Sequence, residues 1–175
     1  RIETTDGVRE AHYLDLWGDD ASMWQLPWRC KVCPDGIGEA ADIAAADTWP
    51  GGSPVRGVDD DDPGTNGVIA RTAVGLELLE AAERDGALTI ECDVDPDDLS
   101  LWQPHQVNKK HAVAARYRGM ADEDRIVPMT NRLRLDELAA QMSDEQYAQQ
   151  REGTRVRIGQ GKATQPRPVP ADEIR

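Results

Sequence analysis

The most regular hydrophobic pattern of the chain lies in residues 72–85. Thr72 is suited to cap the N-terminus of a helix there, and Gly86 is suited to end it. The apolar face of this predicted helix is made by Val74, Leu78 and Ala81. Residues 66–71 before the helix and residues 88–94 after it have the apolar or alternating character of strands. The pattern therefore predicts a strand–helix–strand unit, which is typical of a sheet covered by helices.

Weaker patterns predict the other elements. Short strand-like runs over residues 1–5 and 11–17, on either side of a turn at Asp6-Gly7, indicate a hairpin. Further along, the pattern favours a strand over residues 42–46, with a helical turn as the alternative. Asp95-Pro96 is expected to start a short acidic turn or helix, because Pro96 suits a first helical position. Longer helices are expected over residues 104–120 and 134–150, with Ser143 as a cap of the later half of the second. We therefore expect an α/β (α+β) fold, with a mixed sheet flanked by helices.

The end of the chain differs from the rest. From Gly153 onward the sequence has no apolar period and is interrupted by Gly and Pro. We expect one domain over residues 1–152, followed by a disordered or extended, exposed tail over residues 153–175. The chain does not begin with Met, so the gene product is expected to start upstream of Arg1.

Charge and composition exclude several classes of protein. The net charge is -13, and an acidic surface disfavours both duplex nucleic acid and an anionic membrane as partners. No run of about 18 apolar residues is present that could span a bilayer. The three cysteines do not form the even-numbered framework of a secreted disulfide protein, which favours reduced thiols and a cytoplasmic location.

The strongest chemical motif is Cys30-Lys-Val-Cys33-Pro34. Two thiolates at this spacing can bind one metal centre, and a Cys pair followed by Pro occurs in cluster-binding segments, although a cluster needs four ligands. A structural cysteine pair or a redox dithiol remains an alternative. Cys92 lies in a predicted strand and is expected to belong to the core. The histidines have no spacing that would complete a zinc site.

Two other segments are candidates for binding. In residues 45–52, small residues around Asp47 and Thr48 would let a flat ligand approach, and the following glycines would leave amides open to a phosphate; the alternative is a strand that ends in a tight turn. The predicted helix over residues 104–120 is locally basic, which indicates either a solvated face that balances nearby Asp or contact with an anionic cofactor or partner. Its charged and titratable residues are Lys109, Lys110, His111, Arg116 and Arg118.

Taken in order, these motifs resemble the C-terminal domain of the coenzyme F420 hydrogenase/dehydrogenase beta-subunit family. The resemblance covers roughly residues 28–120. It rests on the cysteine pair, the segment that ends in Asp47-Thr48-Trp49, the run Val68-Ile-Ala-Arg-Thr72 and the Gly75–Leu79 start of the helix. The family resemblance implies an oxidoreductase that contains a [4Fe-4S] cluster and FAD and that exchanges hydride with F420 or with a tetrapyrrole.

The resemblance also implies which residues take part. Cys30 and Cys33 are expected to be cluster ligands, and Asp47, Thr48, Asn66 and Gly67 are expected to lie on the flavin side. Relatives carry further cysteines in an N-terminal portion, so the expected partners are that portion of the same protein and a redox partner subunit, and the isolated fragment is expected to be inactive. Two alternatives are a non-catalytic scaffold or subunit-docking domain with a structural cysteine pair, and a zinc-stabilised nucleic-acid module, which the charge disfavours.

Overall fold

The structure is a computed structural model that describes residues 2–16 and 26–164. In this part of the chain, helices combine with short strands that form two separate antiparallel pairs. The predicted α+β fold class is therefore confirmed, with the strands in two pairs and not in one larger sheet. None of the helices described is long and apolar enough to cross a membrane.

The first hairpin is shorter than predicted. Strand β1 (Ile2–Thr4) pairs with β2 (Gly7–Arg9) around a turn at Thr5-Asp6. The prediction that the second strand covers residues 11–17 is wrong, because residues 13–16 form the short helix α1 (Tyr13–Leu16). The turn places Gly7 opposite Thr4, so Arg9 is already opposite Ile2, the first residue of β1. Residues after Arg9 therefore have no partner in β1 to pair with. Trp17 lies outside the described residues.

The second hairpin agrees with the predicted strands. Strand β3 (Ile43–Asp47) and strand β4 (Asn66–Ala70) pair antiparallel, with Ile43 opposite Ala70 and Asp47 opposite Asn66. Their connection is a long acidic loop that contains the 3-10 turn η2 (Pro50–Gly52). Carboxylates of this loop accept hydrogen bonds from its own amides: Asp59 from Val55, Asp60 from Gly57 and Asp62 from Gly64. These bonds hold the loop in its turns.

Helix α3 (Ala73–Arg84) begins where the pattern predicted. Thr72 is its N-cap and accepts a hydrogen bond from the Gly75 amide at 3.1 Å. The predicted strand over residues 88–94 is wrong, because this segment pairs with no strand in the described part of the chain. Alternation favours a strand only where a neighbour offers ladder bonds and a surface to pack on, and Ile90 and Val94 remain exposed.

The remaining helices follow their sequence signals closely at the N-terminal ends. Helix α4 (Pro96–Trp102) has a capping box between Asp95 and Asp98, and α5 (Pro104–Asp122) begins at Pro104. The single helical region predicted for residues 134–150 is two helices, α6 (Leu135–Ala139) and α7 (Asp144–Gly159). The break lies at Ser143, whose hydroxyl accepts from the Gln146 amide and starts α7 anew.

Helix α7 extends into the segment predicted as an exposed tail. It continues past Gly153 to Gly159, and Thr154 and Ile158 on it are buried. The apolar positions here are too few to form a visible period, but Ile158 reaches the main hydrophobic core. The later part of the predicted tail, residues 165–175, lies outside the described residues.

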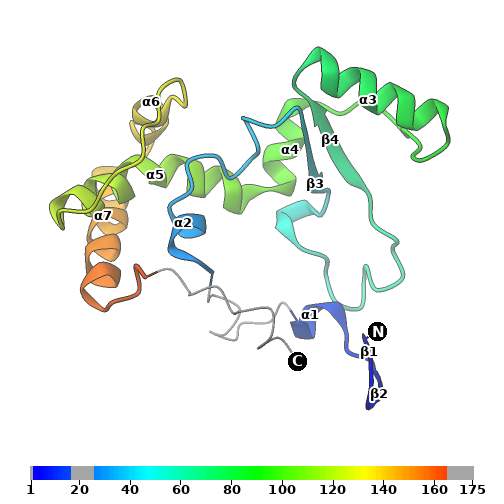
Figure 1. Ribbon diagram of the computed structural model, residues 1–175, viewed down its shortest axis with the longest axis horizontal. Coiled ribbons are helices and arrows are strands. Elements are labelled where there is room, and N and C mark those ends of the chain that lie inside the picture. Colours follow the sequence, from blue (N-terminus) through cyan, green and yellow to red (C-terminus); the bar gives the residue numbers. More distant parts are fainter. Residues whose placement is uncertain (1, 17–25, 165–175) are drawn as a thin grey trace.

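The core of the described part lies around α5. Its α5 members, Val113, Tyr117 and Met120, follow a helical period. The other members come from both sides in sequence: Trp28, Val32, Leu135 and Ile158. Figure 1 shows α5 leading from α6 and α7 at one end, past α4, toward the β3–β4 hairpin and α3 at the other. The core therefore lies at the helical end, and the hairpin extends from it.

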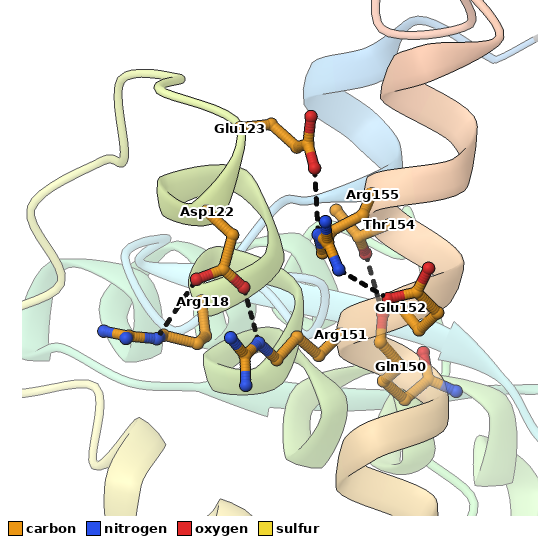
Figure 2. Close-up of polar contacts among 8 residues, drawn as sticks. All are labelled: Arg118, Asp122, Glu123, Gln150, Arg151, Glu152, Thr154 and Arg155. Carbon is orange, nitrogen blue, oxygen red and sulfur yellow. Dashed lines mark hydrogen bonds and ion pairs between the residues drawn. The ribbon is translucent and has the colours of Figure 1, made fainter.

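Helices α5 and α7 approach closely and are joined by ion pairs, shown in Figure 2. A Cβ atom on Gly119 would lie 2.4 Å from the backbone oxygen of Arg151, so only glycine permits this approach. Asp122 on α5 pairs with Arg151 of α7 and with Arg118 one turn earlier, at 3.5 Å. Arg155 pairs with Glu123 across the interface at 2.9 Å. The contact between the two helices thus combines a buried centre with a charged rim.

Candidate functional site

The cysteine pair lies on a loop that is anchored to the core. The one-turn helix α2 (Trp28–Lys31) contains Cys30, and Cys33 follows directly after Val32, the C-cap. The Gly- and Pro-rich sequence of residues 30–38 predicts an irregular backbone, and this helical turn corrects that prediction for Cys30 and Lys31. Trp28 and Val32 are buried in the core, whereas both cysteines are free thiols of intermediate exposure. The apolar neighbours fix the loop while the thiols remain partly accessible.

Three side chains of α5 bind consecutive parts of this loop, which we define as the cysteine loop, residues 30–36. Arg116 Nη1 donates to the carbonyl of Lys31 at 2.9 Å, and Tyr117 Oη donates to the carbonyl of Val32 at 2.9 Å. Earlier on the helix, Lys110 Nζ donates to the carbonyl of Pro34 at 2.8 Å. The backbone on both sides of Cys33 is therefore held by α5.

Lys110 is a buried cation among these three donors. Its side chain is only 6% exposed, and it also forms an ion pair with Glu39. A lysine ammonium is buried at considerable cost unless its donors are satisfied, and the carboxylate and the Pro34 carbonyl provide that satisfaction. The two interpretations of the basic helix, a solvated face or contact with an anionic ligand, therefore do not describe Lys110 and Arg116, which bind the chain's own backbone.

The same enclosure shifts two titrating groups. Burial, together with the nearby Cys33, raises the pKa of Tyr117 to about 12. Burial, together with the charge of Arg157, lowers the pKa of Arg116. Tyr117 thus stays a protonated donor to Val32 far above neutral pH.

The four residues predicted to lie on the flavin side come together at one end of the β3–β4 hairpin. Asp47 is opposite Asn66 in the register, and Gly67 is opposite Ala46. Just beyond the strand, the hydroxyl of Thr48 donates to the Thr65 carbonyl at 3.1 Å. The hairpin therefore brings together two pairs of residues that are far apart in the sequence: Asp47 and Thr48, and Asn66 and Gly67.

Helix α4 and the residue after it cover one side of this hairpin end. Gly67 is buried, and a Cβ atom on it would lie 3.0 Å from Leu99 and 3.2 Å from Trp102. Gln103 Nε2 donates to the Asp47 carbonyl at 2.8 Å. The amide of Gly52, predicted to be open to a phosphate, donates instead to the Trp49 carbonyl at 2.9 Å. Gly67 therefore allows helix α4 to pack closely on the hairpin, and the Gly52 amide is bonded within the turn that contains it.

A hollow of about 310 Å³ lies next to the hairpin end and is strongly acidic. Asp47 and Asn66 are among its lining residues, together with Asp59, Asp60 and Asp62. His12 Nε2 lies 3.0 Å from Asp60 Oδ1, within hydrogen-bond distance, and hydrogen bonds from the Gly57 amide and from His12 lower the pKa of Asp60. These carboxylates favour neutral or cationic groups and repel a diphosphate.

Cys92 does not join the pair. It is exposed, which corrects the prediction that it belongs to a strand core. Among residues 2–16 and 26–164, no three His, Cys, Asp or Glu side chains are grouped so that they could hold a metal ion. Cys30 and Cys33 are thus the two thiols that this part of the chain brings to one loop.

Sequence reasoning missed two residues that position these features. Tyr117 and Gln103 were not singled out, because neither carries charge. The signal for Tyr117 was its spacing: Lys110, Val113 and Tyr117 lie at positions i, i+3 and i+7, on one face of a helix. That face includes the fully buried Val113, so it points inward.

Comparison with known proteins gives one match. Residues 1–95 match the family model that describes the C terminus of the coenzyme F420 hydrogenase/dehydrogenase beta subunit. No curated protein and no solved structure matches the chain. The matched segment contains the cysteine pair and the four residues at the hairpin end, whereas the α5 side chains that bind the cysteine loop lie beyond it.

Proposed function

The chain belongs to the family defined by the C terminus of the coenzyme F420 hydrogenase/dehydrogenase beta subunit, and we propose that it is the part of an F420-linked oxidoreductase whose Cys30 and Cys33 supply two ligands of a [4Fe-4S] cluster. The family is that of a subunit of an oxidoreductase. The observation that carries the proposal is the pair of partly exposed cysteines on a loop that the matched segment contains and the core anchors.

The donor set fits half of such a cluster and not a whole one. A [4Fe-4S] cluster is held by four ligands, usually thiolates. The described residues offer two cysteines on one loop and no third metal-binding side chain grouped with them. We therefore propose that the other ligands come from another portion of the complete protein or from a partner subunit, and we derive no electron-transfer step within this chain.

The loop is well suited to a shared centre. Val32 of the loop and Trp28 just before it are buried in the core, and the carbonyls of residues 31, 32 and 34 accept hydrogen bonds from α5. The thiols are the groups left partly accessible. A centre completed by a second polypeptide segment needs this arrangement, in which one side of the loop is fixed and the other stays open.

For the flavin, we propose a limited role of the hairpin end. Asp47, Thr48 and Asn66 can offer hydrogen bonds to neutral polar atoms of a flavin ring or ribose, and Gly67 permits close packing beneath them. The acidic hollow does not fit the diphosphate of FAD, because four carboxylates lie on its lining. The diphosphate is therefore assigned to a different part of the complete enzyme.

F420 is the hydride carrier that we propose, because the family's description names it. Neither a tetrapyrrole nor FAD has comparable support in the described residues. The alternative of a non-catalytic docking domain gives the cysteine pair a purely structural role, and the following experiment distinguishes the two.

The test uses the assembly that this chain forms in its own cells. A tagged chain is purified without oxygen, and the recovered complex is assayed for F420 reduction in the wild type and in Cys30→Ser, Cys33→Ser and Cys92→Ser variants. We expect F420-dependent activity that the first two variants reduce at least tenfold and that Cys92→Ser leaves unchanged. An assembly whose F420 activity is the same in all four proteins would support the docking domain and refute the proposal.

A further inference from the structure

The backbone on both sides of Cys33 is bound by a helix that lies outside the family-matched part of the chain. The matched segment ends at residue 95, and Lys110, Arg116 and Tyr117 belong to α5 (Pro104–Asp122). Their three hydrogen bonds, of 2.8 to 2.9 Å, go to the carbonyls of residues 31, 32 and 34. Contacts between residues more than 75 positions apart in sequence thus converge on one short loop.

We propose that Lys110, Arg116 and Tyr117 are positioning residues for the cysteine pair, and that they set the spacing and orientation of Cys30 and Cys33 toward a metal centre. This inference rests on the proposed role of the two cysteines as ligands. It goes beyond that role because it assigns the geometry of the pair to side chains of α5.

The hydrogen bonds to the loop carbonyls also fix the direction of the N–H groups in the same peptide units. The peptide bonds of the described residues are trans, so each N–H points away from the carbonyl of the same peptide unit. When Tyr117 holds the Val32 carbonyl toward α5, the Cys33 amide N–H of that unit is directed away from α5. Backbone N–H groups directed at cluster sulfurs are among the features that tune a cluster.

Each of the three donors is also held in place by a contact outside the cysteine loop. Tyr117 belongs to the core, Lys110 is also paired with Glu39, and Arg116 also donates to Gln150 of α7 at 3.0 Å. Each side chain is therefore itself fixed by a partner other than the loop. A loop held by pre-fixed donors loses little conformational freedom when a metal binds, and preorganisation of this kind strengthens binding.

Tyr117→Phe is the cleanest variant with which to test the proposal. It removes one hydroxyl that donates to Val32 and leaves the ring in the core and the net charge unchanged. Tyr147→Phe is the matched control, because Tyr147 lies in the first turn of α7 and has no bond to the cysteine loop. Both variants are made in the 175-residue chain with Cys92→Ser, which leaves Cys30 and Cys33 as the two thiols of this sequence.

The probe is Co²⁺ alone, added without oxygen and followed by thiolate-to-cobalt charge-transfer absorbance. We expect Co²⁺ to bind the parent chain, and Cys30→Ser to abolish the absorbance. Tyr117→Phe should raise the dissociation constant about three- to tenfold, the range of one lost hydrogen bond. Tyr147→Phe should leave it within about twofold, and circular dichroism should show both variants folded.

The outcomes separate the two proposals. A parent chain without thiolate–cobalt absorbance would refute the cysteine pair as a metal half-site, and the positioning inference would fall with it. A parent chain that binds Co²⁺, together with an unchanged constant in a folded Tyr117→Phe, would refute the positioning role alone.

A second pair of variants decides the question if Tyr117→Phe does not fold. Arg116→Gln removes the donor to Lys31, and Arg118→Gln removes a neighbouring charge of α5 that instead pairs with Asp122. Loss of a positive charge by itself favours a bound cation in both variants. Weaker Co²⁺ binding confined to Arg116→Gln would support positioning, whereas equal or tighter binding than in Arg118→Gln would overturn it.

Discussion

Gly119 determines how closely α5 and α7 can pack, and its replacement by alanine should measure the value of that approach. An added Cβ would lie 2.4 Å from the Arg151 backbone oxygen and 3.0 Å from the Thr154 Cβ. The obstacle is backbone on one side and a side chain with 2% exposure on the other, so neither can move aside without separating the helices. Gly119→Ala should therefore destabilise the fold.

The expected magnitude is the difference between two opposing effects. Alanine in the interior of a helix is about 1 kcal/mol more favourable than glycine. Overpacking in a close-packed interior costs about 1–3 kcal/mol and sometimes more, and backbone contact places this site at the upper end. We expect a net loss of about 2 kcal/mol in the free energy of unfolding, which corresponds to a Tm about 4–8 °C lower for a chain of this size.

A matched control is available on the partner helix. At Gly153 of α7, the nearest atom to an added Cβ is Arg157 Nη1 at 3.1 Å, the end of a flexible side chain. Gly153→Ala should therefore stabilise the chain by about 0.5–1 kcal/mol. Urea unfolding followed by circular dichroism compares the variants with wild type. A Gly119→Ala variant as stable as Gly153→Ala would refute the close approach of α5 and α7.

Two further predictions concern pH. The pKa of Tyr117 is raised from 10.0 to about 12 in the folded chain, so its contribution to stability is complete below pH 10 and is lost as the pH rises toward 12. The phenolate absorbance of wild type minus that of Tyr117→Phe, read within seconds of a pH jump, should titrate with a midpoint near 12. A midpoint near 10 would contradict the buried donor. Hydrogen bonding to Arg151, with the charges of Arg151 and Arg118, lowers the pKa of Asp122 below its usual 3.8. The contribution of Asp122 to stability is therefore present above pH 3.8 and is lost as the pH falls through the lowered pKa. Asp122→Asn should lower the urea midpoint of unfolding at pH 7 and lower it less at pH 3, and an equal difference at both pH values would contradict the ion pair.

The sequence predicted the elements whose signals are local. Thr72 and Ser143 marked helix starts correctly, because a side chain that satisfies a free amide within three residues needs no distant partner. Pro96 did so for an equally local reason, since a first helical position needs no amide donor. The strand predicted over residues 88–94 failed for the opposite reason. Its pattern is right for a strand, but a strand exists only where another strand pairs with it.

The sequence suggested candidate residues for the site, but it did not indicate the α5 side chains that hold the cysteine loop. Spacing nominated Cys30 and Cys33 as candidates, the small residues around Asp47 nominated that carboxylate, and the resemblance added Asn66, which the β3–β4 register places opposite Asp47. The hydrogen bonds from α5 to the cysteine loop join residues 31–34 to residues 110–117, and no local pattern encodes contacts at that separation. Charge was also misleading there, because Lys110 and Arg116 of α5 donate to carbonyls of the chain's own backbone.

The most direct test of the central claim is the iron and acid-labile sulfide content of the assembly purified without oxygen. The claim is that Cys30 and Cys33 are ligands of a cluster completed outside the described residues. Wild type and Cys92→Ser should contain equal iron and sulfide, whereas Cys30→Ser and Cys33→Ser should each lose most of both, because a cluster without one thiolate has a labile iron. Full iron and an unchanged cluster absorbance in both single variants would contradict the claim and leave the cysteine pair a structural feature of the loop.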